Sequence, residues 1–234
     1  MGSNNDISLK ALAKINLGLD VVRRREDGYH EVRMIMQTIH LYDRLDIKRT
    51  KEPGIQIQTN LSFLPVNENN LIYKAAKLLM DEFSITDGVS VKLDKRIPVA
   101  AGMAGGSTDA AAMLIGVNRL FSLGLTKREL MERGVQIGAD VPYCIMRGTA
   151  LAEGIGEALS PLPPMVKCPV LIAKPSISVS TKFVYQNLKL DDTTIHPDID
   201  RLIDDIKAKN LHDIAAHMGN VLETVTIPAY PVIA

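Results

Sequence analysis

The stretch KRIPVAAGMAGGSTDAAA, residues 95–112, combines residue types that could bind an anion through the backbone. Gly102, Gly105 and Gly106 allow positive φ angles and let a ligand approach the main chain closely. We expect a helix to open at Ser107, with its first amides and its dipole directed into the loop. This arrangement predicts a phosphate-binding loop. The loop lacks the lysine of a P-loop, and GMAGG does not match GxGxxG, so it is a phosphate loop of another kind.

A structural interpretation of the same stretch stays open. Small residues after a strand also make tight turns, and Ala110–Ala112 also suit close packing between helices. The local pattern favours phosphate binding, but it does not by itself remove the packing alternative.

Two charged residues outside the loop are candidates for acid–base chemistry. Residues 7–22 alternate apolar and polar types and predict a long strand, on which Lys14 and Asn16 share one face. A lysine on a half-exposed sheet usually points to solvent, and it gains a chemical role only beside an anionic partner. Asp140 lies in a bend before the apolar stretch YCIM. It is either a turn residue or a carboxylate at the mouth of a cleft, able to accept a proton or orient a hydroxyl.

Tyr29 and His30 follow Asp27-Gly28, which is a strong turn signal. The two rings could stack on a flat ligand and form hydrogen bonds with its edge. Taken alone, however, the pair favours ordinary surface packing.

Alternating strand and helix patterns position these candidates in the first part of the chain. Strand patterns cover residues 31–47, 55–59, 89–97 and 148–154. Helix patterns cover residues 71–83, 107–121 and 127–138. The helix at 71 follows a cap-rich segment, and Thr126 with Glu129 matches a capping box.

Composition limits the function classes. The formal net charge is zero, and aromatic and basic residues do not alternate, which argues against a nucleic-acid partner. No apolar run reaches the length of a membrane-spanning helix and the N-terminus lacks a signal-peptide pattern, so we expect a cytoplasmic protein without a membrane partner. The two cysteines, Cys144 and Cys168, form no metal-binding or redox spacing, and we expect reduced thiols.

Prolines at 161, 163 and 164 predict a domain boundary, with one domain at residues 1–158 and a second at 159–234. The second part carries a predicted short buried strand at 170–173 and three helices. The first is capped at Ser180 or Thr181, and the others cover residues 198–209 and 210–222. These elements are too few for a closed layer. We therefore expect the second domain to be incomplete.

Three stretches in this order resemble the GHMP kinase superfamily: AKINLGLDVVRRREDGYHEV, KRIPVAAGMAGGSTDAAA and IGADVPYC. The resemblance runs from about Leu9 to Glu223. It implies an α+β, two-domain GHMP-kinase fold, with an N-terminal domain like domain 2 of ribosomal protein S5 and a truncated ferredoxin-like C-terminal domain. AKINL followed by DGYH is similar to the members that phosphorylate the 2-hydroxyl of 4-diphosphocytidyl-2-C-methyl-D-erythritol in the non-mevalonate isoprenoid pathway. The resemblance thus implies an enzyme that uses ATP and Mg²⁺.

The resemblance also implies roles for particular residues. Lys14 and Asp140 match the catalytic pair, in which the carboxylate receives the proton of the attacking hydroxyl. An adjacent ammonium weakens that carboxylate as a base, so positioning of the hydroxyl is the alternative role. Ser107 is implied to contact the metal. The residues implied to bind ATP are Asn70, Lys95, Pro98, Val99, Ala100, Ala101, Gly102, Met103, Ala104, Gly105, Gly106, Ser107 and Thr108. Those implied to bind the cytidylyl substrate are Asn16, Tyr29, His30, Thr181 and Tyr185.

The chain departs from the family pattern in two ways. Met103 and Thr108 replace commoner residues, which are mild changes. A third glycine-rich motif, expected later in the family, does not occur here, and this puts activity of the chain itself in question. Other readings are a mevalonate- or homoserine-type kinase, a non-catalytic RNA-binding module, or an inactive nucleotide-binding remnant. For the kinase we expect a monomer or weak homodimer acting on a small molecule.

Overall fold

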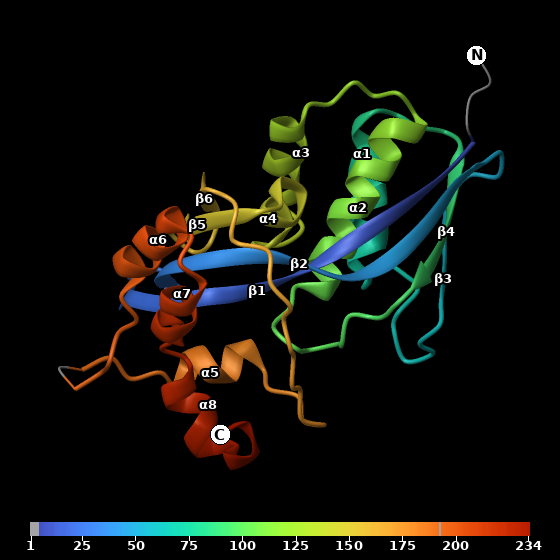
Figure 1. The fold of residues 1–234 in the computed structure, drawn as a ribbon. Coiled ribbons are helices and arrows are strands. Elements are labelled where there is room, and N and C mark those ends of the chain that lie inside the picture. The colour runs from blue at the N-terminus through green and yellow to red at the C-terminus, as the bar shows by residue number, and fades with distance from the viewer. Residues whose placement is uncertain (1–4, 192) are drawn as a thin grey trace. The chain divides into compact units, whose positions relative to one another are not determined.

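The computed structural model describes residues 5–191 and 193–234 (Figure 1). The described part divides into two compact units. The first unit contains residues up to Ala13 together with Ile39–Val99 and Met103–Met146. The second contains Lys14–Thr38, Ala100–Gly102 and Arg147–Ala234. Each unit thus contains part of two long strands, β1 (Asp6–Arg24) and β2 (His30–Thr50). The predicted boundary after residue 158 divides the chain by sequence, whereas these units are defined by contacts and interleave along it.

In the first unit, a sheet is covered by helices. Strand β4 (Gly88–Asp94) pairs antiparallel with β2 and parallel with β3 (Ile55–Thr59). Helices α1 (Leu71–Glu82) and α2 (Gly105–Leu120) pack against each other. Helix α2 also packs on α3 (Lys127–Gly134) and α4 (Val141–Met146). Gly116 brings α2 onto the sheet, because a Cβ built there would lie 3.5 Å from Leu9 Cδ1.

In the second unit, β5 (Thr149–Glu153) pairs antiparallel with β2 and with β6 (Ala158–Pro161). The two-residue β7 (Gly219–Asn220) pairs parallel with β1, with Gly18 opposite Gly219. Helices α6 (Ile199–Ala208) and α7 (Leu211–His217) supply the core that covers these strands (Figure 1). Its fully enclosed members include Leu17 and Ile35 from the strands and Leu202 and Ile214 from the helices.

The remaining helices of the second unit are short. Helix α5 (Thr181–Asn187) begins after its cap Ser180, as predicted. Helix α8 (Glu223–Ala229) and the 3₁₀ turn η1 (Pro231–Ile233) follow β7. The sequence did not predict α8, because Pro228 lies inside it and removes a helix hydrogen bond.

The structure corrects four of the predicted elements. The helix predicted over residues 210–222 ends at His217, because Gly219 and Asn220 pair with β1 as β7. Residues 170–173 form no strand, because none of the described segments pairs with them and a strand needs a partner for its backbone hydrogen bonds. They are not buried either, since Leu171 is 97% exposed. Helix α2 begins at Gly105, two residues before the predicted start. The helix predicted to extend to residue 138 ends at Gly134. The other predicted strands and helices of the first 160 residues are confirmed within a few residues at their ends.

Candidate functional site

The glycine-rich loop has an unusual backbone that leads directly into α2. Ala100, Gly102 and Ala104 all have left-handed φ angles, of 54°, 68° and 56°. For a non-glycine residue this conformation costs about 1–2 kcal/mol, so the two alanines must be held there by their surroundings. Ala104 caps α2 without any side-chain hydrogen bond to the first amides of the helix. The start of α2 therefore presents main-chain donors and no side-chain acceptor, which suits an anion.

Three segments of the first unit converge at the start of α2. The Thr108 hydroxyl donates to the Leu12 carbonyl of β1 at 2.8 Å. A Cβ built on Gly106 would lie 3.4 Å from Leu71 Cδ1, at the start of α1. A Cβ built on Gly138 would lie 4.0 Å from Ser107 Oγ. The helix start thus lies beside the segments that carry the predicted residues Asn70 and Asp140.

Asp140 directly precedes α4 and is half-buried. Its carbonyl accepts from the Cys144 amide at 3.0 Å, which begins the helix. Asn70 is the side-chain cap of α1: its Oδ1 accepts from the Ile72 amide at 2.9 Å, and its Nδ2 donates to the Pro65 carbonyl at 2.7 Å. The side chain of Asn70 is therefore engaged in the cap of α1, and its backbone is engaged too: its amide donates to the Asn67 carbonyl at 2.9 Å, and its carbonyl accepts from the Lys74 amide at 3.1 Å.

The structure places the predicted nucleotide residue Lys95 in a buried ionic cluster. Its ammonium donates to Asp43 Oδ2 and, at 2.9 Å, to Asp109 Oδ2. The three side chains are at most 5% exposed. Burial raises the pKa of Asp109 to about 8; the Lys95 ammonium opposes this rise, and Asp43 adds to it. The charge of Lys95 is therefore neutralised inside the protein.

In the second unit, the predicted residues Lys14 and Asn16 are brought together. Lys14 is buried, and its ammonium donates to Asn16 Oδ1 at 3.2 Å. The two residues are two positions apart in β1, so the expected shared face is confirmed. Lysines are usually exposed. Because Lys14 is buried, the alternative that it points to solvent does not hold.

The predicted cytidylyl residues also lie in the second unit. The rings of His30 and Tyr185 contact each other in a tilted arrangement, with centroids 5.0 Å apart and an interplanar angle of 35°. Tyr29 follows the turn made by Gly28 and is 61% exposed. Thr181 is the exposed first residue of α5, the helix that carries Tyr185. The structure thus pairs His30, rather than Tyr29, with Tyr185.

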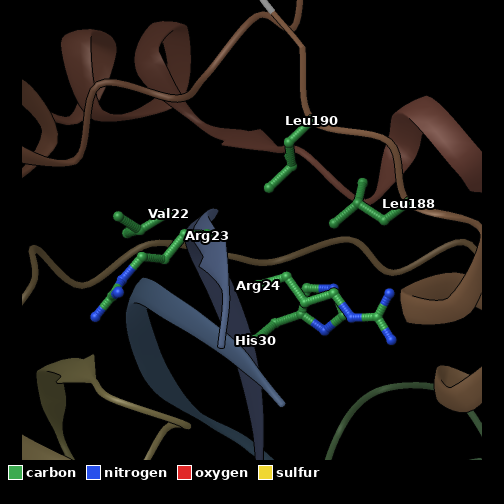
Figure 2. A pocket seen from close by; sticks show the side chains of 6 residues that line it. All are labelled: Val22, Arg23, Arg24, His30, Leu188 and Leu190. Atoms are coloured by element: carbon green, nitrogen blue, oxygen red, sulfur yellow. The ribbon is translucent and has the colours of Figure 1, made fainter. Parts of the chain in front are cut away.

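A pocket of about 390 Å³ lies next to His30. It is lined by Val22, Arg23, Arg24, His30, Leu188 and Leu190. Figure 2 shows the hairpin residues Arg24 and His30 on one side and the two leucines on the other. Arg23 forms an ion pair with Glu31, at 2.5 Å. Desolvation lowers the pKa of His30, and the positive charge of Arg24 lowers it further. His30 is therefore held toward its neutral form.

Sequence reasoning missed Asp43, Asp109 and the pocket residues Arg24, Leu188 and Leu190. Asp43 lies within a long strand, 52 positions from Lys95. Nothing in its neighbourhood distinguishes it from other charged strand residues. Asp109 lies in the glycine-rich stretch at residues 95–112, but only its burial beside Lys95 distinguishes it as a functional candidate. The two leucines follow α5 in a segment without regular structure.

Comparisons with known proteins identify the family of this chain. A model of the GHMP kinases N terminal domain matches residues 70–148. The chain is 62% identical over 227 residues to 4-diphosphocytidyl-2-C-methyl-D-erythritol kinase of Lachnospira eligens, covering 97% of this chain and 79% of that protein. It is 52% identical to the kinase of the same name from Acetivibrio thermocellus, covering 97% and 80%.

Solved structures give the same result for the fold. A crystal structure of 4-(cytidine 5'-diphospho)-2C-methyl-D-erythritol kinase superposes with a TM-score of 0.77 at 31% identity, over 97% of this chain and 79% of that one. Homoserine kinase from Cytophaga hutchinsonii superposes with a TM-score of 0.71 at 16% identity, over 100% and 78%, and this supports the fold alone. The α+β GHMP-kinase fold expected from the sequence is confirmed, and the chain belongs to the 4-diphosphocytidyl-2-C-methyl-D-erythritol kinase family of the GHMP kinases.

Proposed function

We propose that this protein transfers the γ-phosphoryl group of ATP to the 2-hydroxyl of 4-diphosphocytidyl-2-C-methyl-D-erythritol, a step of non-mevalonate isoprenoid biosynthesis. The observation that carries the proposal is the glycine–alanine loop, which leads into α2 with no side-chain cap. The 62% identity to a kinase named for this substrate supports the choice of acceptor. Pro98–Thr108 would hold the triphosphate through main-chain amides.

In the proposed reaction, the substrate hydroxyl oxygen attacks the γ-phosphorus, the bond between that phosphorus and the β,γ-bridging oxygen breaks, and ADP leaves. Asp140 accepts the hydroxyl proton, and Lys14 stabilises the charge that develops on the transferred group. Two contacts support these roles. Gly138, two residues before Asp140, lies beside Ser107, and Thr108 binds Leu12, two residues before Lys14 in the sequence.

A metal ion in this reaction would be Mg²⁺, which neutralises charge on the phosphates. Mg²⁺ needs few protein ligands when phosphate oxygens complete its shell. That fits the donor set here, because no cluster of three or more His, Cys, Asp or Glu residues suited to a metal occurs in the described part of the chain. The hydroxyl of Ser107, at the start of α2, would supply a protein oxygen.

The cytidine part of the substrate would bind in the second unit. We assign His30 and Tyr185 to the cytosine ring, with Tyr29 as a further aromatic wall. Asn16 and Thr181 would complete this subsite. Neutral His30 can both donate and accept a hydrogen bond, which suits the edge of a pyrimidine.

The proposal extends to the protein's setting. We place it in the cytoplasm as a monomer or weak homodimer without a nucleic-acid partner; the zero net charge supports the last point. We also propose residues 1–158 as the nucleotide-binding and catalytic domain and residues 159–234 as the substrate domain. Asn16, Tyr29 and His30, which we assign to the substrate, lie in the first of these ranges. None of the described helices is both long and apolar enough to span a membrane.

The test is turnover of ATP by the purified chain with the cytidylyl substrate, mevalonate or homoserine. We expect turnover only with the first acceptor. Asp140→Ala should lower kcat by about 10²–10⁴-fold, the usual contribution of a group that handles the proton. Glu132→Ala, which removes half of an exposed ion pair on α3, is the control and should retain wild-type turnover. An Asp140→Ala protein that keeps most of its turnover would contradict the role given to Asp140.

A further inference from the structure

The segment between β4 and the phosphate loop is held by two side chains from elsewhere in the first unit. Asp43 Oδ1, on β2, accepts from the Arg96 amide at 2.5 Å and from the Ile97 amide at 2.8 Å. Asn60 binds both backbone groups of Lys95: the Lys95 amide donates to it at 2.8 Å, and the Lys95 carbonyl accepts from it at 3.0 Å. The chain is thereby fixed immediately before Pro98, where the loop begins.

The other end of the loop is held by the same cluster. The Lys95 ammonium bridges Asp43, on β2, and Asp109, on α2. It also lies against the first residue of α2, because a Cβ built on Gly105 would be 2.8 Å from Lys95 Nζ. A single ammonium therefore connects the entry of the loop with the start of the helix that follows it.

The stability of the protein does not by itself explain this buried ionic cluster. Burying charged groups carries a large desolvation penalty, and apolar residues of similar volume often give equal or greater stability in such places. Asp109 Oδ1 is buried and has no hydrogen-bond partner among the described residues, so the cluster is not even fully satisfied. What the cluster provides is a directional connection between two segments that apolar contacts would leave free to shift.

We propose that Asp43, Lys95 and Asp109 form a buried ionic clamp, which fixes both ends of the phosphate loop and positions its amides for a nucleotide triphosphate. The proposal rests on the proposed function, because it takes the loop to be the ATP-phosphate site. The three residues are positioning residues: they act through the backbone of residues 96–105 and need not touch the nucleotide. The clamp accounts for Lys95 without a direct contact between its ammonium and a phosphate.

The test compares binding of MgATP and of the cytidylyl substrate by the same full-length samples, with isothermal titration calorimetry. Lys95→Met removes the ammonium at similar length, and Asp109→Asn replaces the carboxyl group that binds Lys95 by an amide of nearly the same size. Lys77→Met and Asp81→Asn break an exposed ion pair on α1 and serve as matched controls. Urea unfolding of each sample establishes that it is folded.

We expect Lys95→Met to raise the dissociation constant for MgATP by about tenfold or more, and Asp109→Asn to raise it by about threefold or more. The cytidylyl substrate should bind all variants within about twofold of the wild type, because the clamp acts on the phosphate loop alone. A general loosening of the protein would instead weaken the binding of both ligands. The controls should leave both constants unchanged. If Lys95→Met does not fold, Asp109→Asn alone decides.

The outcomes separate the two proposals. A folded clamp variant that binds MgATP as tightly as the wild type would refute the clamp alone, and so would a parallel loss of both ligands. Wild-type protein that binds no MgATP would instead refute the assignment of the loop, and with it the proposed function.

Discussion

At the scale of single residues, the most consequential finding is the position of Lys95. A lysine directly before a phosphate loop is expected to reach the phosphates, yet its ammonium is buried and forms hydrogen bonds with the side chains of Asp43 and Asp109. Lys14 differs, because its ammonium donates to the neutral side chain of Asn16. Of the two lysines, Lys14 thus keeps the greater capacity to stabilise phosphoryl charge, in agreement with its proposed catalytic role.

A testable prediction at the scale of single residues concerns the pKa of His30. Desolvation lowers its pKa, and the charge of Arg24 lowers it further. Removing that charge by Arg24→Ala should raise the pKa of His30 toward its ordinary value of 6.5, because the imidazolium would no longer be repelled. The measurement is an NMR titration of the His30 ring protons. Because a lowered pKa in the folded state disfavours protonation, His30 opposes folding progressively as the pH falls below 6.5, and Arg24→Ala should weaken this loss.

Arg128→Ala is a suitable control for the titration, since that side chain belongs to the exposed ion pair on α3, in the other compact unit. It should leave the pKa of His30 unchanged. A His30 pKa that stays the same or falls in Arg24→Ala would contradict the electrostatic role given to Arg24.

At the scale of elements, local sequence signals were reliable wherever the partner lay nearby. Helix α3 begins at a complete capping box, with Glu129 N donating to Thr126 Oγ1 at 3.3 Å and Thr126 N donating to Glu129 Oε2 at 2.8 Å. Helix α5 likewise begins at Ser180, one of its two predicted caps, and α6 and α7 begin one residue after their predicted starts at Asp198 and Asn210. The start of α2 was predicted two residues late, because its cap is Ala104, which has no capping side chain.

The capping box gives a stability prediction. Thr126→Ala removes the acceptor for the Glu129 amide and should lower the free energy of unfolding by about 1 kcal/mol. Urea denaturation followed by circular dichroism measures this change. Arg128→Ala in the same helix breaks only an exposed ion pair and should change the stability by about 0.5 kcal/mol or less. Equal effects of the two substitutions would show that the cap does not stabilise α3.

At the scale of the whole molecule, the described chain forms two compact units, and each depends on its own core. In the second unit, α6 approaches β1 at Gly18, where an added Cβ would lie 2.8 Å from Ile199 Cδ1 and 2.9 Å from Leu202 Cδ2. A glycine inside a strand often marks such close approach. Its role was not evident from the sequence, because the helix that needs the space lies about 180 residues later in the chain, far beyond any local pattern.

This packing predicts how much a cavity in the core of the second unit lowers the free energy of unfolding. Leu202 is fully buried between α6 and the strands, so Leu202→Ala should lower the free energy of unfolding by about 2–5 kcal/mol. Leu211, at the start of α7, is 38% exposed, and Leu211→Ala should cost about 0.5 kcal/mol. Thermal and urea unfolding of the two variants make the comparison. Similar losses for both would mean that α6 does not anchor this unit.

The sequence by itself determined the elements whose signals are local: the alternating strands, the capped helices, the turn at Asp27-Gly28, and the glycine-rich stretch that marks a phosphate loop. Its motifs also identified the kinase family, which the comparisons confirmed. Only the tertiary structure decided that Lys95 is enclosed by Asp43 and Asp109, that His30 contacts Tyr185, and that residues 170–173 are not a strand. The physical reason is the same in each case. Burial, ion pairing and strand pairing depend on partners distant in sequence, and no local pattern records them.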